Sequence, residues 1–320
     1  MKLIDLNKPL WQWLLLVALA FTWGSSFILM KKGLESYDNL QLASLRILIA
    51  FIVLSPILFK NFRKIKNDQW IPILISGFLG AGIPAFLFAT AQTEISSSLS
   101  GMLNSLVPLF TVFIGVLFFN LKLRKLKLLG VGIGLAGALG LLSSTGAISL
   151  ANQELLYGML VVIATICYAS NVNFIKVKLE AVSSINITSF GFILIGPAAG
   201  IFLFTTDFTE RLQNDPDGPL NLFYIALLAI FGTAVAVILF NMLIKKVSAV
   251  FASSVTYMIP VFALFWGFID GEAIVPTQII FIAIILSGIY MVNRDKMIEM
   301  KEARRQRKAD KRSNKLETGN

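Results

Sequence analysis

Long apolar runs, separated by short polar stretches, recur along nearly the whole chain of 320 residues. An α-helix needs about 20 apolar residues to cross the hydrocarbon core of a bilayer, and most of the runs reach that length. The pattern therefore predicts an all-α integral membrane protein with ten transmembrane helices. The expected spans are residues 10–30, 40–59, 70–92, 98–119, 126–143, 154–175, 186–205, 220–244, 249–269 and 277–293.

The composition agrees with this pattern. Hydrophobic residues make up 56% of the chain and charged residues only 14%, whereas about 25% of the residues of a soluble domain are charged. Lipid has to cover the excess of apolar surface, so we expect a multi-pass protein of the plasma (inner) membrane with membrane lipids as partners.

The basic residues indicate how the chain is oriented. If the N-terminus is cytoplasmic and the side alternates at each span, 24 of the 28 Lys and Arg residues lie on the cytoplasmic side and three on the external side, with Arg46 inside a span. Positive residues favour the cytoplasmic side of membrane proteins, so both termini are predicted to be cytoplasmic. This topology explains the net charge of +10 better than a nucleic-acid partner does.

The chain also contains an internal repeat. Aligning Pro108 with Pro260 superimposes two similar stretches at an offset of 152 residues. The same offset pairs Gly80 with Gly232, Phe88 with Phe240 and Ser96 with Ser248. Two halves of five helices each must enter the membrane from opposite sides, which gives two inverted five-helix repeats. Such halves can rock about a shared site near the middle of the membrane, as secondary transporters do.

We divide the chain accordingly into four parts. They are a cytoplasmic N-terminus (1–9), a first repeat (10–145), a second repeat (154–293) and a basic cytoplasmic tail (294–320). The tail either binds anionic lipid head groups or is a solvated extension.

Residue types absent from the chain exclude several functions. There is no histidine, and Cys167 is the only cysteine, so histidine metal sites, Ser-His-Asp triads and internal disulfides are excluded. With no paired acids or nucleophile–base constellation in the spans, we expect no enzyme, no catalytic or metal site and no cofactor.

The sequence resembles the drug/metabolite transporter superfamily, in particular its ten-helix EamA-type exporters. The matching features are TWGSSF (22–27), LASLRILIAF (42–51), the pattern around Pro108 followed by a glycine-rich fifth helix, and the stretch 247–292. The resemblance implies a central cavity lined by helices one, three, four, six, eight and nine, with helices five and ten at the periphery. The family usually has a Glu near the end of the fourth and ninth helices; here Glu272 fits the second position, but Asn120 occupies the first.

Polar, aromatic and helix-breaking residues on the expected cavity helices are the candidate binding residues. At an offset of 145, Trp23, Ser25 and Ser26 on the first helix pair with Tyr168, Ser170 and Asn171 on the sixth. Such residues either bind a ligand or hold helices together. The full candidate set is Trp23, Ser25, Ser26, Arg46, Phe88, Gln92, Asn104, Pro108, Tyr168, Asn171, Asn241, Thr256, Tyr257 and Pro260. The prolines are expected to interrupt their helices, either for gating or as inherited helix shape.

Arg46 lies about seven residues inside the second span. Either its guanidinium faces the cavity and attracts a carboxylate or phosphate of the substrate, or it is structural, bonded to helix-end carbonyls or extended to the external interface.

None of the 18 acidic residues falls in the middle of a span, which disfavours a proton-coupled exporter of cations. We interpret Glu272, near an external end, as a residue that organises the loop or the mouth, with a coupling site as the alternative.

The glycines of the fifth helix concern packing. Gly130 and Gly134 form a GxxxG pair, which serves either packing within the chain or dimerisation. We favour packing, and expect a monomer or weak homodimer.

The functional expectation is a secondary carrier that exports small organic metabolites, such as amino acids or related amphipathic compounds, by alternating access. The alternatives are a translocator of lipid-linked or nucleotide sugars, or a membrane scaffold without transport activity.

Overall fold

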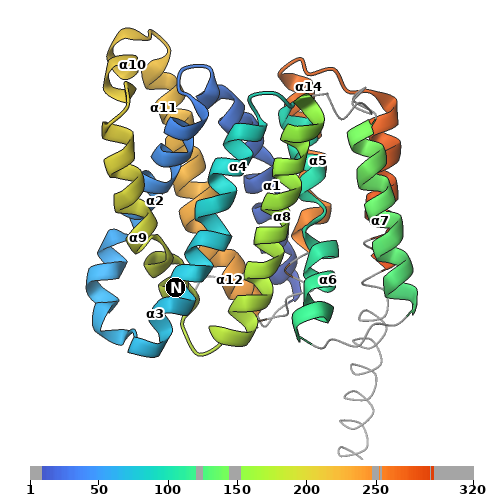
Figure 1. The fold of residues 1–320 in the computed structure, drawn as a ribbon, viewed down its shortest axis with the longest axis horizontal. Coiled ribbons are helices and arrows are strands. Elements are labelled where there is room, and N and C mark those ends of the chain that lie inside the picture. Colours follow the sequence, from blue (N-terminus) through green and yellow to red (C-terminus); the bar gives the residue numbers. More distant parts are fainter. Residues whose placement is uncertain are drawn as a thin grey trace, which may run out of the picture.

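A computed structural model of the chain describes residues 9–119, 125–143, 153–246, 252, 254–288 and 290–291. These residues form an all-helical bundle with no strand among them, in which most helices run parallel or antiparallel to one another (Figure 1). Seven helices are long and apolar enough to cross a membrane, and three shorter apolar ones, within 132–141, 259–269 and 276–288, complete ten spans. The predicted fold class is confirmed.

The helices of the first half follow the expected order. They are α1 (Pro9–Leu34), α2 (Asn39–Asn61), the third span made of α3 (Trp70–Gly77), η3 (Phe78–Gly82) and α4 (Ile83–Ala91), the fourth span made of α5 (Ser97–Asn104) and α6 (Val107–Phe119), and α7 (Lys125–Ser143). Two short 3₁₀ turns, η1 (Phe62–Lys64) and η2 (Asn67–Gln69), connect α2 to α3.

The second half repeats this order. Its elements are α8 (Gln153–Lys178), α9 (Ser184–Phe204), α10 (Phe208–Asn214), the eighth span made of α11 (Gly218–Leu227), η4 (Leu228–Val235) and α12 (Ala236–Lys246), and the ninth made of η5 (Ser254–Tyr257) and α14 (Ile259–Ile269). The helix Pro276–Gly288 follows. α10 lies between the expected spans 186–205 and 220–244, and an Asp207–Arg211 ion pair of 2.8 Å spans one helical turn there.

The third and eighth spans contain a π-helical segment at equivalent places, η3 and η4. A π segment widens one turn of the helix and is common at functional sites. Gly80 and Gly232, which the repeat pairs, lie in these two segments.

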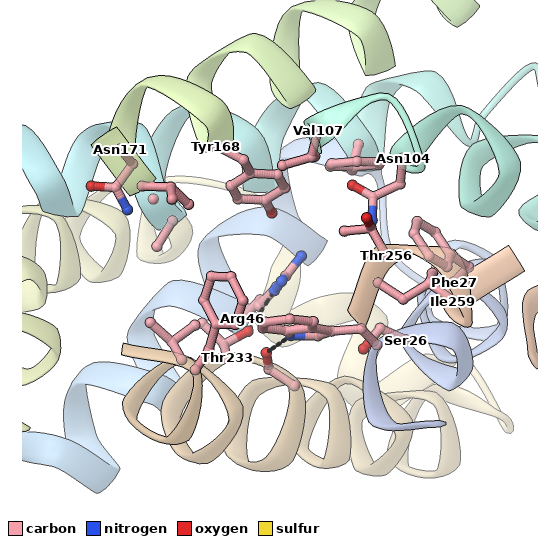
Figure 2. A pocket seen from close by; sticks show the side chains of 18 of the residues that line it. Ser26, Phe27, Arg46, Asn104, Val107, Tyr168, Asn171, Thr233, Thr256 and Ile259 are labelled. Carbon is pink, nitrogen blue, oxygen red and sulfur yellow. Dashed lines mark hydrogen bonds between the residues drawn. The ribbon is translucent and has the colours of Figure 1, made fainter. Parts of the chain in front are cut away.

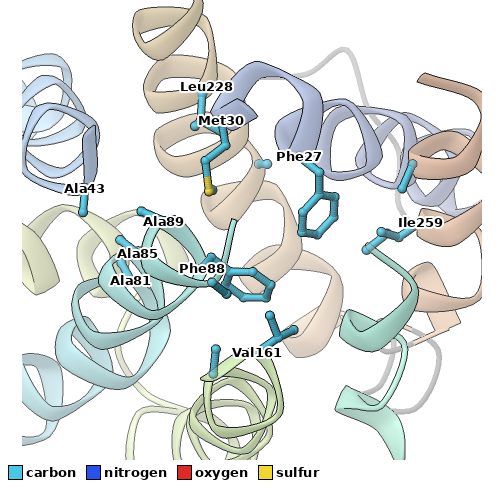
Figure 3. Packing of buried hydrophobic residues seen from close by; sticks show 14 of the residues in the cluster. Phe27, Met30, Ala43, Ala81, Ala85, Phe88, Ala89, Val161, Leu228 and Ile259 are labelled. Carbon is cyan, nitrogen blue, oxygen red and sulfur yellow. The ribbon is translucent and has the colours of Figure 1, made fainter. Parts of the chain in front are cut away.

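The core is shared by both halves. Phe27 and Met30 on α1 and Phe88 on α4 belong to the same cluster as Val161 on α8 and Ile259 on α14 (Figure 3). Small residues let helices approach closely in a membrane protein. Such an approach occurs between α3 and α9, where a Cβ added to Gly77 would lie 2.1 Å from the carbonyl oxygen of Gly191.

The two fifth helices, α7 and Pro276–Gly288, lie side by side at the edge of the bundle (Figure 1). A Cβ added to Gly288 would lie 2.6 Å from the carbonyl oxygen of Gly130 and 2.6 Å from the backbone nitrogen of Gly134. The GxxxG pair thus serves packing within the chain, as predicted, and these two helices are peripheral.

Candidate functional site

A cavity lies between the two halves of the bundle. It encloses about 880 Å³ of space that no atom fills, including the part that is open to solvent. Helices one, two, three, four, six, eight and nine contribute to its lining. Nine of the fourteen predicted residues line it: Trp23, Ser26, Arg46, Phe88, Asn104, Tyr168, Asn171, Asn241 and Thr256. That these residues bind a substrate stays a prediction.

The remaining five are placed elsewhere. Ser25 accepts a hydrogen bond of 2.8 Å from the indole nitrogen of Trp266. Gln92 is buried at the end of α4, and neither polar atom of its side chain has a partner. Pro108 and Pro260 do not line the cavity, and the side chain of Tyr257 lies outside the described residues.

Pro108 and Pro260 act differently from our expectation. Each is the second residue of its helix, α6 or α14, so neither interrupts a hydrogen-bonded ladder. Proline is tolerated there because the first amide groups of a helix have no partner within it. The breaks come just before, at Ser105 and Leu106 in the fourth span and at Met258 in the ninth.

Both breaks open onto the cavity. Asn104 and Val107 flank the first, and Thr256 and Ile259 flank the second, and all four line the cavity. The Oδ1 atom of Asn104 has no hydrogen-bond partner although the residue is only 7% exposed. Figure 2 shows the Asn104 side chain on the wall of the cavity.

The first helix of one half contacts the third helix of the other half. The indole nitrogen of Trp23 on α1 donates a hydrogen bond of 2.9 Å to the carbonyl oxygen of Gly232 in η4. The Trp23 ring also meets Phe240 of α12 edge to face, with centroids 5.0 Å apart. Ser26 lies so close to Gly232 that a Cβ added to Gly232 would be 2.7 Å from the hydroxyl oxygen of Ser26.

The equivalent contacts recur on the other side. Tyr168 on α8 stacks on Phe88 of α4 with centroids 6.0 Å apart. A Cβ added to Gly80 in η3 would lie 2.2 Å from the amide nitrogen of Asn171, whose Oδ1 accepts a hydrogen bond of 2.7 Å from Ser76. The paired residues are those that the two sequence offsets relate, so the repeat exists in the contacts as well as in the sequence.

Arg46 is the one charged side chain among the described residues that line the cavity. It is 9% exposed, and its Nε donates a hydrogen bond of 2.7 Å to the hydroxyl of Thr233 in η4. The guanidinium points across the cavity toward the Tyr168 hydroxyl (Figure 2). It therefore does not reach the interface, and its hydrogen bond goes to a side-chain hydroxyl rather than to a helix-end carbonyl.

Some lining residues were missed by the sequence reasoning. Phe240 had a usable signal, because the repeat pairs it with Phe88. Thr233 had none beyond its position next to Gly232, because its role depends on the arginine of another helix. Apolar residues such as Phe27 and Val237 look like ordinary core positions in the sequence.

One end of the bundle, where α1 ends and α5 begins, is held by an ionic network around Glu272. The Glu272 carboxylate accepts hydrogen bonds of 2.5–3.0 Å from the backbone N–H groups and hydroxyls of Ser97 and Ser98. The Nζ of Lys31 lies 3.1 Å from the same carboxylate and 2.6 Å from Asp270. We call this set of residues the Lys31–Glu272 network.

Local backbone geometry brings the two acids together. Gly271 between them has a φ of 78°, which glycine adopts without strain. The N-terminus of α5 favours an anion because its free amide groups point outward. Burial raises the pKa of Glu272, but the bonds from Ser98, Ser97 and Lys31 outweigh this and hold the pKa below its ordinary 4.5. These bonds join the loop after α14 to the start of α5; the role of Glu272 as an organiser of the loop, rather than a coupling site, stays a prediction.

A ten-span helical bundle, with a cavity of mainly apolar walls and a few polar side chains between two related halves, defines a multi-pass membrane protein of the transporter class. The chain belongs to the EamA-like transporter family, whose model matches residues 10–143 and again residues 155–294. The family lies within the drug/metabolite transporter superfamily, as the sequence resemblance indicated.

Curated relatives agree with this assignment. An inner membrane transporter of Escherichia coli K12, YedA, described as uncharacterized, is 28% identical over 296 residues, 88% of this chain and 90% of the relative. An S-adenosylmethionine/S-adenosylhomocysteine transporter of Chlamydia trachomatis serovar L2 is 24% identical over 282 residues, 85% of this chain and 86% of the relative. The family match and the helical bundle together make this protein a multi-pass membrane transporter.

A solved crystal structure shares the fold. It superimposes with a TM-score of 0.60 at 16% identity and covers 88% of this chain and 94% of its own.

Proposed function

We propose that the protein is a secondary carrier that moves a small organic metabolite across the membrane by alternating access, and that its direction is export. The observation that carries this proposal is the position of the cavity. It lies where the first helix of each half meets the third helix of the other. A relative tilt of the halves would change both sides of such a site together, which is how carriers with inverted repeats expose a site alternately.

The broken fourth and ninth spans support the same mechanism. Backbone groups freed at a break inside a membrane need protein or cavity water as partners. Here both breaks lie on the cavity wall, where a polar ligand or water can reach them. The breaks also divide each span into two rigid pieces that can move against each other.

Flux measured in proteoliposomes tests the proposal. The purified full-length chain would be reconstituted and loaded with radiolabelled amino acids and amphipathic carboxylates, amines and neutral compounds. Protein-dependent, saturable flux of at least one compound is expected. A complete absence of such flux across the panel would contradict the carrier function.

Cysteine accessibility separates a carrier from a scaffold. On a Cys167→Ala background, Ser26→Cys, Asn104→Cys and Asn171→Cys place thiols on the cavity wall. Small membrane-impermeant reagents are expected to label them from each face of sided vesicles. Thr165→Cys, fully buried on α8 and outside the cavity lining, is the matched control and is expected to stay unreactive.

We further propose that both termini are cytoplasmic, which places the Lys31–Glu272 network at the external end. The support is the distribution of Lys and Arg between the two sides. Reporter fusions at each terminus test this: both are expected on the cytoplasmic side, and opposite sides would overturn it.

A further inference from the structure

Arg46 carries a positive charge that no described carboxylate balances. In the described part of the chain, the ion pairs gather at the Lys31–Glu272 network and on α10, and none includes Arg46. A guanidinium has five N–H donors. The hydrogen bond to Thr233 occupies one of them, and the hydroxyl of Tyr168 is a second neutral partner. The other donors of the guanidinium belong to a side chain that is about nine-tenths buried and lines the cavity.

A buried cation without a counter-ion is costly in a membrane protein, and residues of this kind mark substrate and ion pathways. The alternatives to a ligand role are weak here. Arg46 does not extend to the interface, and it is fixed at Nε by a side chain that itself lines the cavity. The guanidinium extends from Thr233 toward the hydroxyl of Tyr168, and both of these neutral partners line the cavity (Figure 2).

The single positive charge of the cavity lining favours a ligand with one negative charge. A phosphate monoester carries about −1.5 to −2 charges at pH 7, and the described lining offers a single cation and no carboxylate. A carboxylate carries one negative charge and matches a guanidinium with two parallel hydrogen bonds. A net cation would meet Arg46 with no acid on the described wall to offset the repulsion.

The rest of the wall suits the body of an amphipathic molecule. The aromatic pairs Trp23–Phe240 and Tyr168–Phe88 border the cavity on two sides. The unpartnered Oδ1 of Asn104 offers an acceptor to an N–H group of the ligand. Apolar walls with a few placed polar groups are typical of sites for small organic ligands.

We propose that the substrate of this carrier is an amphipathic organic carboxylate, bound through Arg46. The proposal rests on the proposed carrier function and adds the charge class of the substrate. Among molecules with the same skeleton, the carboxylate binds best, the neutral amide binds more weakly, and the amine binds worst.

The test uses three probes that differ only in the head group: 3-phenylpropanoate, 3-phenylpropanamide and 3-phenylpropylammonium. Binding to the detergent-purified full-length chain is measured by titration calorimetry, and flux is measured in proteoliposomes. A charge-assisted hydrogen bond in a buried site corresponds to roughly 10- to 100-fold in affinity. The wild-type chain is expected to prefer the carboxylate over the amide by about this factor.

Arg46→Gln is expected to remove this preference while affinity for the amide stays within about threefold. The amide therefore serves as an internal check that the variant is folded. Arg46→Lys keeps the positive charge but loses the planar group that donates two parallel hydrogen bonds, so an intermediate preference for the carboxylate is expected. Arg211→Gln, at the half-exposed ion pair on α10 and outside the cavity lining, is the matched loss of an arginine and should leave the preference unchanged.

Two results would overturn the carboxylate proposal without touching the carrier function. One is a preference that Arg46→Gln leaves intact, and the other is flux of neutral or cationic compounds with no binding of any carboxylate. The absence of flux for every compound would instead contradict the carrier function itself.

Discussion

The two halves of the protein agree at the cavity and differ in their charges. On one side Trp23 and Ser26 contact Phe240 and Gly232, and on the other Tyr168 and Asn171 contact Phe88 and Gly80. The second helices differ, because α2 carries Arg46 in its interior and its counterpart α9 carries no charged residue. The fourth and ninth spans differ as well, since Asp270 and Glu272 follow the ninth, whereas the offset of 152 pairs them with the uncharged Phe118 and Asn120.

This comparison separates two kinds of information in the chain. Residues that the halves share build the frame of the cavity, because both halves must pack against each other in the same way. Residues that they do not share give the cavity a charge and hold one end of the bundle with ion pairs. In our proposals, the symmetry allows the motion of the two halves, and the unshared Arg46 gives the cavity its selectivity.

The largest effect on stability is expected at the Lys31–Glu272 network. Glu272→Gln keeps the shape of the side chain but removes the charge that Lys31, Ser97 and Ser98 bind. Loss of charge-assisted bonds to a buried group should lower the free energy of unfolding by about 2–3 kcal/mol. Unfolding in mixed detergent micelles measures this change.

The control is Glu35→Gln, which removes a carboxylate from the same end of the bundle. Among the described residues, Glu35 forms its ion pair with Lys32, and its side chain is 52% exposed. A surface ion pair of this kind contributes about 0–1 kcal/mol. Equal losses in the two variants would mean that the burial of Glu272 has no energetic consequence.

The second prediction concerns how the stability difference between wild type and Glu272→Gln depends on pH. The change with pH cannot exceed the stability difference itself. The folded pKa of Glu272 lies below the ordinary 4.5 because hydrogen bonds from Ser98, Ser97 and Lys31 outweigh the opposing effect of burial. A depressed carboxylate pKa adds stability above the unfolded pKa and loses it as the pH falls through the folded pKa. The difference between wild type and variant should be constant at neutral pH and shrink below pH 4.5. A difference that grows on acidification would show that the pKa shift has the opposite sign.

The smallest effects are expected for the paired aromatic contacts. Double-mutant cycles with Trp23→Leu and Phe240→Leu, and with Tyr168→Leu and Phe88→Leu, should each give a coupling of about 0.5–1.5 kcal/mol. Similar couplings in the two cycles would show that the symmetry extends to energies. A cycle between Trp23 and Phe190, which belongs to a separate cluster, should give almost none. Coupling in only one of the two pairs would restrict the symmetry to geometry.

Much of the site was predictable because it follows from the repeat. The offsets of 145 and 152 relate the residues that turn out to border the cavity in equivalent places, including Trp23 with Tyr168 and Phe88 with Phe240. The prediction for Pro108 and Pro260 was wrong because a proline can either break a helix or lie in its first turn. The backbone turn just before each proline distinguishes the two cases, and the sequence does not show it. The π segments of the third and eighth spans were not foreseen, because apolar periodicity does not distinguish a wider turn from an ordinary one.

The sequence by itself determined the ten spans, the repeat and the presence of one arginine among apolar residues. These properties depend on which residues prefer lipid and on spacing along the chain, so no neighbour in space is needed to predict them. Only the tertiary structure decided that Arg46 bonds to Thr233 and that Glu272 binds the start of α5, since those partners are 187 and about 175 residues away. The reason is physical: whether a buried charge is paired depends on what packing brings to it.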